Sequence, residues 1–184
     1  IVVCFFCLLA ISSAFHTTIP RIERPTHWAV ILLGVAGVCY LALLPFLGRA
    51  WNSMTRTTIA IVALSGIAGR LLMLPSTPVF ETDFNRYLLD GANVAHGENP
   101  YSQSPKEQLK ALEQEPDEGS LRYEMKYSPR AANVIDDINH THLKTIYPPV
   151  AQLSFAAAYL LQPWSLGAWK FILFMADLAS LLLL

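Results

Sequence analysis

The stretch Glu81–Tyr101, ETDFNRYLLDGANVAHGENPY, decides how the chain folds, because it places charged and amide side chains after a long apolar sequence. On a helix of about 100° per residue, its polar residues form one stripe with spacings of 3, 4, 3 and 4: Asp83, Arg86, Asp90, Asn93 and Gly97. An adjacent apolar stripe contains Phe84, Tyr87, Leu88, Gly91, Val94 and Ala95. The pattern predicts an amphipathic helix over Asp83–His96. We expect its apolar stripe to face the membrane surface or the spans, and its polar stripe to face across it.

The rest of the chain has the composition of a membrane protein. Of its 184 residues, 53% are hydrophobic and 15% are charged, below the ~25% that is usual for soluble domains. All 14 acidic residues except Glu23 and Asp177 lie between Glu81 and Asp137. The charges therefore belong to one polar insert in an apolar chain. The net charge of −1 does not indicate a nucleic-acid partner.

The apolar runs predict an all-α fold, a polytopic bundle of transmembrane helices with a polar extracytoplasmic loop that contains short amphipathic helices. Residues 1–74 would hold three spans, residues 75–147 the loop, and residues 148–184 two further spans. Both ends lie inside apolar runs, so we expect a fragment of a longer protein. The core of a signal peptide is the alternative for the first run. The five expected runs are Ile1–Phe15, Trp28–Leu47, Thr57–Leu74, Pro149–Leu161 and Ala168–Leu184.

The polar insert should contain two more short helices. One begins with the capping box at Ser104 and stops before Pro116, and the other runs from Ser128 to about Asn139. The positive-inside rule does not orient the chain, because the first two loops carry equal numbers of Lys and Arg. If the first run spans the membrane with its start inside, the third span delivers the insert outside.

Within the polar stripe, Asp83 is the candidate for proton abstraction. Arg86 can pair with Asp90 at i, i+4, which leaves Asp83 less neutralised near the membrane end of the helix. One available carboxylate at a membrane surface suits a general base. Gly91 and Gly97 would let another segment approach closely. The alternative is a surface helix with a solvated polar stripe.

Arg70 is a second unusual residue, because it lies inside the apolar run before Pro75. A charge in a span is a functional candidate by default. An anion such as a lipid phosphate would be its partner. The alternative is that the side chain extends to the nearby interface.

A third group of candidates lies in INHTHLKTIYPPVAQLSF, Ile138–Phe155. His140 and His142 are two residues apart, which is poor spacing for a helical metal site, and no third ligand is evident. The sequence therefore requires no metal or cofactor. Tyr147 begins the segment that re-enters the membrane.

The order of these motifs resembles the bacterial membrane glycosyltransferases of the GT-C superfamily, especially the mannosyltransferases that depend on polyprenyl-phosphate-mannose. The resemblance extends from about Arg70 to the end of the chain. The motifs that carry it are Arg70, TDFNRYLLDG (82–91), GENPY (97–101), INHTHLKTIYPP (138–149) and KFILFMADLASLLLL (170–184).

The resemblance implies an integral membrane enzyme of the bacterial inner membrane, with the loop outside. It would transfer a sugar, mannose or another hexose, from a polyprenyl-phosphate donor to a lipid-linked or cell-surface glycan, usually with inversion. Its partners would be this donor, a glycan or glycolipid acceptor, and membrane lipids. By motif position Asp83 would be the general base, although three apolar runs precede it here where the family has one. The implied substrate-binding residues are Arg70, Arg86, Tyr87, Asp90, Asn99, Tyr101, His140 and Tyr147.

Two other classes of function fit the same residues. A lipid-sugar transporter would use the polar groups only for binding and would tolerate Asp83→Asn. A structural membrane subunit would tolerate changes at Arg70, Asp83 and Arg86 alike.

Overall fold

The structure is a computed structural model that describes Cys7, Ala10 and residues 26–51, 55–76, 78 and 81–183. These residues form helices and connecting turns, and no strand occurs among them, so the all-α prediction is confirmed for this part of the chain. The predicted first run, Ile1–Phe15, lies outside the described residues apart from Cys7 and Ala10. The chain divides into two compact units, Ile1–Phe80 and Glu81–Leu184, and each is described by itself.

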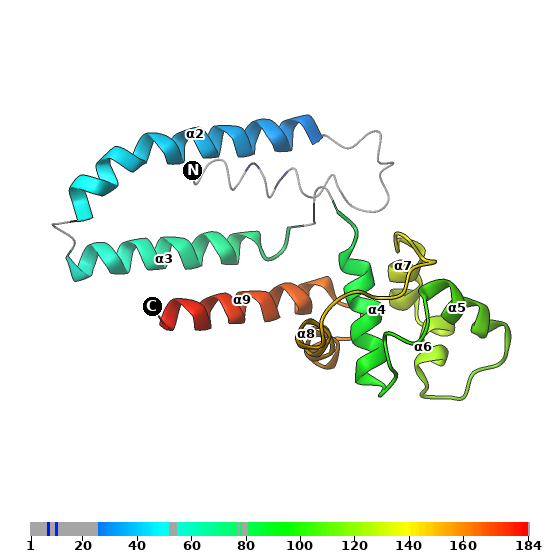
Figure 1. Ribbon diagram of the computed structural model, residues 1–184. Helices are drawn as coiled ribbons and strands as arrows, with labels where there is room; N and C mark the ends of the chain where they lie inside the picture. Colours follow the sequence, from blue (N-terminus) through cyan, green and yellow to red (C-terminus); the bar gives the residue numbers. More distant parts are fainter. Residues whose placement is uncertain are drawn as a thin grey trace. The chain divides into compact units, whose positions relative to one another are not determined.

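The first unit contains two long helices, α2 (Thr26–Trp51) and α3 (Arg56–Met73) (Figure 1). Thr55 begins α3 as its N-cap, because its hydroxyl accepts a hydrogen bond from the Thr58 amide at 3.2 Å. Both helices were predicted, and each begins one or two residues earlier than the apolar pattern indicated. Among the described residues, α3 alone is long and apolar enough to cross a membrane. Two shorter apolar helical stretches are Thr26–Ala42 and Pro149–Leu161.

The second unit contains the helices of the polar insert and the two that follow it. They are α4 (Phe84–Ala95), α5 (Pro105–Lys110), the 3-10 turn η3 (Ala111–Glu113), α6 (Leu121–Tyr127), α7 (Pro129–Asp136), α8 (Pro149–Leu161) and α9 (Leu166–Leu182). The predicted helices at Asp83–His96, after Ser104, after Ser128 and at Pro149–Leu161 are confirmed.

Serine caps set the starts of the short helices. Ser104 and Glu107 form the predicted capping box of α5, with Ser104 N donating to Glu107 Oε2 at 2.7 Å. Ser128 caps α7 through its hydroxyl alone, which accepts from the Ala131 amide at 3.5 Å. Helix α6 was not predicted from the sequence, although Ser120 caps it and accepts from the Tyr123 amide at 3.2 Å. With only seven residues, α6 is too short for its apolar positions to show a clear period.

Helix α6 is held in place by its carboxylate Glu124. Tyr159 of α8 and the indole of Trp164 both donate hydrogen bonds to Glu124 Oε2. Trp164 has a φ of 57°, so the turn after α8 adopts a left-handed conformation that brings the indole to this carboxylate. The insert and the following helices thus form one core.

Helix α4 lies at the centre of the second unit, where it contacts α7, α8 and α9 (Figure 1). Its apolar side chains Leu88, Leu89 and Ala92 are buried in a core with α6, α7 and the Tyr159–Trp164 region. The predicted approach of another segment at Gly91 is confirmed, because a Cβ there would lie 2.4 Å from the Phe155 carbonyl oxygen of α8.

Two interpretations of α4 from the sequence are wrong. The alternative of a surface helix with a fully solvated polar stripe fails, because Asp90 and Asn93 are each 1% exposed. Packing of α8 on α4 covers the second half of that stripe. No other segment approaches Gly97 closely among the described residues, because none of their atoms beyond the adjoining chain lies within 4 Å of its expected Cβ. It instead has a φ of 75°, which lets the chain turn after α4.

Candidate functional site

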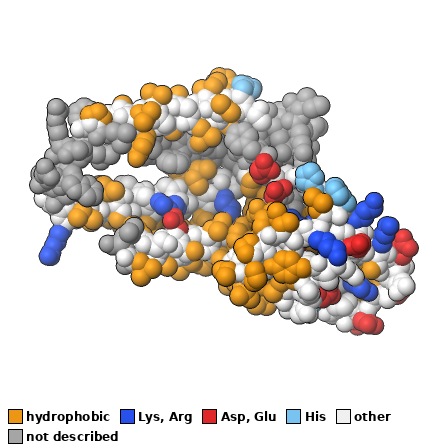
Figure 2. All heavy atoms as spheres, in the orientation of Figure 1, with side chains coloured by type: hydrophobic (Ala, Val, Ile, Leu, Met, Phe, Trp, Pro, Cys, Tyr) orange, Lys and Arg blue, Asp and Glu red, His pale blue; other side chains and the backbone are white. Residues whose placement is uncertain are grey.

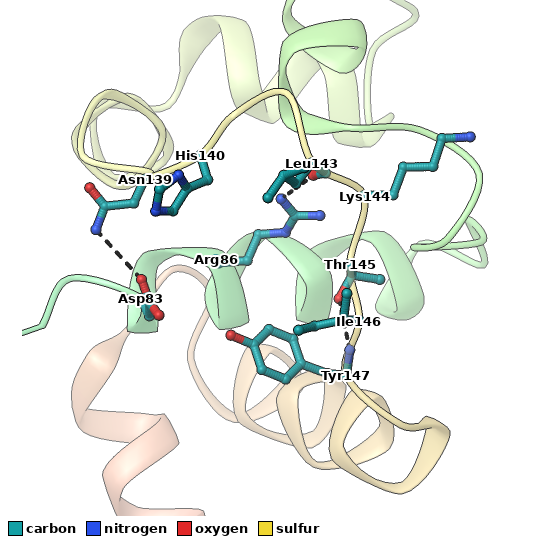
Figure 3. A pocket seen from close by; sticks show the side chains of 9 residues that line it. All are labelled: Asp83, Arg86, Asn139, His140, Leu143, Lys144, Thr145, Ile146 and Tyr147. Carbon is teal, nitrogen blue, oxygen red and sulfur yellow. Dashed lines mark hydrogen bonds between the residues drawn. The ribbon is translucent and has the colours of Figure 1, made fainter.

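A cleft of about 160 Å³ lies between the start of α4 and the segment that leads into α8 (Figure 3). We call it the Asp83 cleft. Asp83 and Arg86 come from the N-terminal part of α4, and the opposite wall comes from a stretch more than 50 residues later. The lining residues are Asp83, Arg86, Asn139, His140, Leu143, Lys144, Thr145, Ile146 and Tyr147. Four residues that the sequence singled out therefore meet here: Asp83, Arg86, His140 and Tyr147.

The carboxylate of Asp83 is available to the cleft. Asp83 occupies the N-cap position of α4, yet its side chain makes no capping hydrogen bond. Its Oδ1 lies 3.5 Å from Asn139 Nδ2, and the same amide donates to Thr82 Oγ1 at 2.6 Å. The side chain is half-buried. The carboxylate is thus oriented by a neutral amide and keeps lone pairs for a substrate hydroxyl.

Arg86 is fixed at two points. Its Nε donates to Asp90 Oδ1 at 3.0 Å, which confirms the predicted i, i+4 pair. Its Nη1 donates to the Leu143 carbonyl oxygen at 2.9 Å, so the guanidinium also ties α4 to the opposite wall. Asp90 is itself buried below the cleft and accepts a second hydrogen bond from Gln152 Nε2 at 3.2 Å. Asp90 therefore positions Arg86 and does not line the cleft.

Tyr147 lines the cleft, and its ring packs against the rings of Tyr87 and Phe155, which do not line it. The Tyr87 ring stacks on Phe155 at 4.8 Å between centroids and meets the Tyr147 ring edge-on at 5.0 Å. Burial raises the pKa of the Tyr147 phenol, and the neighbouring Tyr87 hydroxyl and Asp83 charge raise it further. Tyr147 consequently stays a neutral hydrogen-bond donor at the cleft.

His140 reaches the cleft from a turn. Its φ is 52°, and its carbonyl oxygen accepts from the Leu143 amide at 2.9 Å. This left-handed backbone places the imidazole between Asn139 and Arg86 on the wall opposite α4 (Figure 3). The His140 and His142 rings are 6.3 Å apart. Among the described residues, no group of three His, Cys, Asp or Glu side chains is arranged to hold a metal ion.

Asn99 and Tyr101 are predicted binding residues that also do not line the Asp83 cleft. Asn99 Oδ1 accepts from the Tyr101 amide at 3.0 Å, and the Tyr101 hydroxyl donates to the Tyr147 carbonyl oxygen at 2.6 Å. Both residues thus tie the turn after α4 to the backbone beside the cleft. Arg70 belongs to the first unit, where it is exposed on α3 and its Nη1 donates to the Gly66 carbonyl oxygen at 3.2 Å.

Four polar residues of the site were not singled out from the sequence: Asn139, Lys144, Thr145 and Gln152. The first three lie inside the motif that carried His140 and Tyr147, but nothing in the linear pattern separates them from their neighbours. Gln152 did give a signal, since it is a lone amide in the apolar sequence of α8. A buried amide in such a helix needs a polar partner, and here the partners are Asp90 and Thr145.

No family model, curated protein or solved structure matches the chain.

Proposed function

We propose that this chain belongs to an integral membrane glycosyltransferase of the bacterial inner membrane. It would transfer a hexose from a polyprenyl-phosphate donor to a lipid-linked or cell-surface glycan. The observation that carries the proposal is the Asp83 cleft, where a half-buried carboxylate, a guanidinium, an imidazole and a neutral phenol line one cavity.

These groups match the two requirements of the reaction. The acceptor hydroxyl gives its proton to Asp83 while its oxygen bonds to the anomeric carbon. The bond from that carbon to the phosphate oxygen breaks, and the lipid phosphate leaves with the electron pair. Arg86 and His140 line the same cleft and can donate hydrogen bonds to the departing anion. The phenol of Tyr147 offers a further donor to a sugar hydroxyl.

The apolar surface supports a polytopic membrane bundle. Helices α2 and α3 expose side chains such as Val38 at 67% and Leu64 at 65%. Within the second unit, α8 exposes Leu153 at 64% and Leu160 at 74%. Figure 2 shows hydrophobic side chains gathered over α8, while charged side chains gather over α5–α7. Such large apolar patches are typical of surfaces that contact lipid or other helices.

Transfer assays on the full-length protein in membranes test the proposal. A labelled polyprenyl-phosphate hexose is supplied with a membrane glycolipid extract, and labelled product is measured for the wild type and for Asp83→Asn. We expect transfer by the wild type and its loss in the variant. A lipid-sugar transporter would move the donor across the membrane and would keep that activity in Asp83→Asn. A structural subunit would show neither activity and would tolerate substitution of Arg70, Asp83 and Arg86.

A further inference from the structure

A buried chain of hydrogen bonds connects the two walls of the Asp83 cleft. Gln152 of α8 is 3% exposed. Its Nε2 donates to Asp90 Oδ2 at 3.2 Å and to Thr145 Oγ1 at 3.0 Å. The other oxygen of Asp90 accepts from Arg86 Nε. Since Arg86 and Thr145 lie on opposite walls, one amide group joins the guanidinium to the segment that faces it.

That segment depends on few other contacts within the described residues. Its exposed side chains include Leu143 at 52% and Ile146 at 88%, so they contribute little to a core. Thr145, by contrast, is 8% exposed, and its hydroxyl also accepts from the Tyr147 amide at 3.4 Å. The position of this wall therefore rests on Thr145, on the Arg86 bond to Leu143, and on Tyr147, whose ring packs on Tyr87 and Phe155 and whose carbonyl oxygen accepts from Tyr101.

The hydrogen bonds of the Gln152 amide, compared between its nitrogen and its oxygen, indicate why this residue is a glutamine. Gln152 Oε1 is buried and has no hydrogen-bond partner among the described residues. A buried carbonyl without a partner destabilises a fold, whereas an apolar side chain of similar length would bury no such group. The unpartnered oxygen thus gives no reason for an amide at this position. The two donors of the amide, used to join Asp90 and Thr145, account for the glutamine.

We propose that Gln152 is a positioning residue that sets the separation between the Arg86 guanidinium and the 143–147 segment across the cleft. It contacts no substrate. It acts through Asp90 on one wall and through Thr145 on the other. The catalytic consequence rests on the proposed glycosyl transfer. In that reaction Gln152 would keep Arg86 aligned with the leaving phosphate.

Mobility of a spin label tests this assignment without a substrate. The full chain, with Cys4, Cys7 and Cys39 replaced by serine, carries Ile146→Cys labelled with a nitroxide. Gln152→Met keeps the length of the side chain and removes the amide. Thr145→Val keeps the shape and removes the hydroxyl. We expect each change to shift the nitroxide spectrum toward the mobile line shape in protein that remains folded by circular dichroism.

Two controls separate positioning from packing. Gln108 of α5 is also buried, and its Oε1 also has no hydrogen-bond partner among the described residues. Gln108 does not line the Asp83 cleft. Gln108→Met should leave the nitroxide spectrum unchanged. The double variant Gln152→Met with Thr145→Val should move the spectrum no further than Gln152→Met alone, because both remove the same link.

An unchanged spectrum in folded Gln152→Met and in Thr145→Val overturns the assignment. An additive double variant also overturns it. If Gln152→Met does not fold, Thr145→Val decides alone. Turnover provides a second readout, since loss of positioning lowers kcat in protein that is still folded. A mobility shift together with absence of transfer by the wild type would leave the assignment standing and reject the glycosyltransferase.

Discussion

Gly91 of α4 faces Phe155 of α8 so closely that a Cβ on Gly91 would lie 2.4 Å from the Phe155 carbonyl oxygen and 2.6 Å from its carbonyl carbon. Both atoms belong to the backbone, so no side-chain rotation can make room. The contact brings α4 and α8 together where Asp90 meets Gln152. The buried polar chain below the cleft therefore depends on a glycine at this position.

Gly91→Ala should force α4 and α8 apart. Overpacking of this kind destabilises a folded protein by about 1–3 kcal/mol, and we expect a loss of that size in denaturant unfolding of the detergent-solubilised chain. Gly69→Ala on α3 is the control, because nothing lies within 4 Å of its expected Cβ. It should be neutral or stabilising by up to about 1 kcal/mol. Equal stability of Gly91→Ala and wild type would contradict the close approach.

Asp83→Asn and Asp90→Asn should have different effects although both remove one charge. Asp83→Asn should keep the melting temperature and lower turnover by roughly 10²–10⁴-fold, because it removes the proposed base. Asp90→Asn should lower stability by about 1–3 kcal/mol, since it weakens two buried hydrogen bonds. Thermal unfolding and transfer rates, measured on the same preparations, separate the two roles.

Full activity in Asp83→Asn would reject that residue as the base. A stable, fully active Asp90→Asn would show that the Arg86 and Gln152 bonds to Asp90 do not hold the site.

Arg70→Lys tests the predicted phosphate contact. An Arg in a span has an insertion cost of ~2.5–3.5 kcal/mol at mid-membrane, which a bound anion would offset. A guanidinium holds two phosphate oxygens in a fixed fork, and an ammonium does not. We therefore expect weaker donor binding in Arg70→Lys and a more severe loss in Arg70→Leu. Unchanged donor titration and turnover in Arg70→Lys would leave the residue as an interfacial anchor.

The insert should face the outside of the inner membrane. In a chain without Cys4, Cys7 and Cys39, a single Cys at the exposed Gln114 should react with a membrane-impermeant thiol reagent in intact spheroplasts. A single Cys at Thr55, between α2 and α3, should react only after lysis. The reverse pattern would invert the topology and with it the proposed mechanism.

The capping box of α5 should make stability depend on acid pH. The Ser104 backbone amide and hydroxyl donate to Glu107 and lower the pKa of that carboxyl below its usual 4.5. As the pH falls, the unfolded chain therefore binds the proton first. This contribution to stability is complete above about pH 4.5 and is lost as the pH falls through the lowered pKa.

Glu107→Gln keeps the geometry of the box without the charge. Its denaturation midpoint should fall less steeply than that of the wild type between about pH 5 and pH 3. Parallel curves for the two proteins would show that the Ser104 contacts do not shift the titration of Glu107.

Several elements followed from the sequence because their causes are local. The lengths of the apolar runs predicted α2, α3 and α8, the period of the apolar residues predicted α4, and the serine caps predicted α5 and α7. The spacing of four residues was sufficient for the Arg86–Asp90 pair, since such residues share one face of a helix. The same spacing did not reveal that α8 would cover Asp90 and Asn93, because no property of α4 alone specifies what packs on it.

By itself, then, the sequence determined an all-helical chain with one polar insert and a carboxylate, Asp83, at the start of its central helix. Only the tertiary structure decided which residues share a cleft with that carboxylate. Asn139 and Tyr147 reach Asp83 across more than 50 residues because Gly91 lets α8 pack against α4 and Gln152 bonds both walls. Contacts at such separations arise from packing and buried hydrogen bonds, which have no period in the sequence.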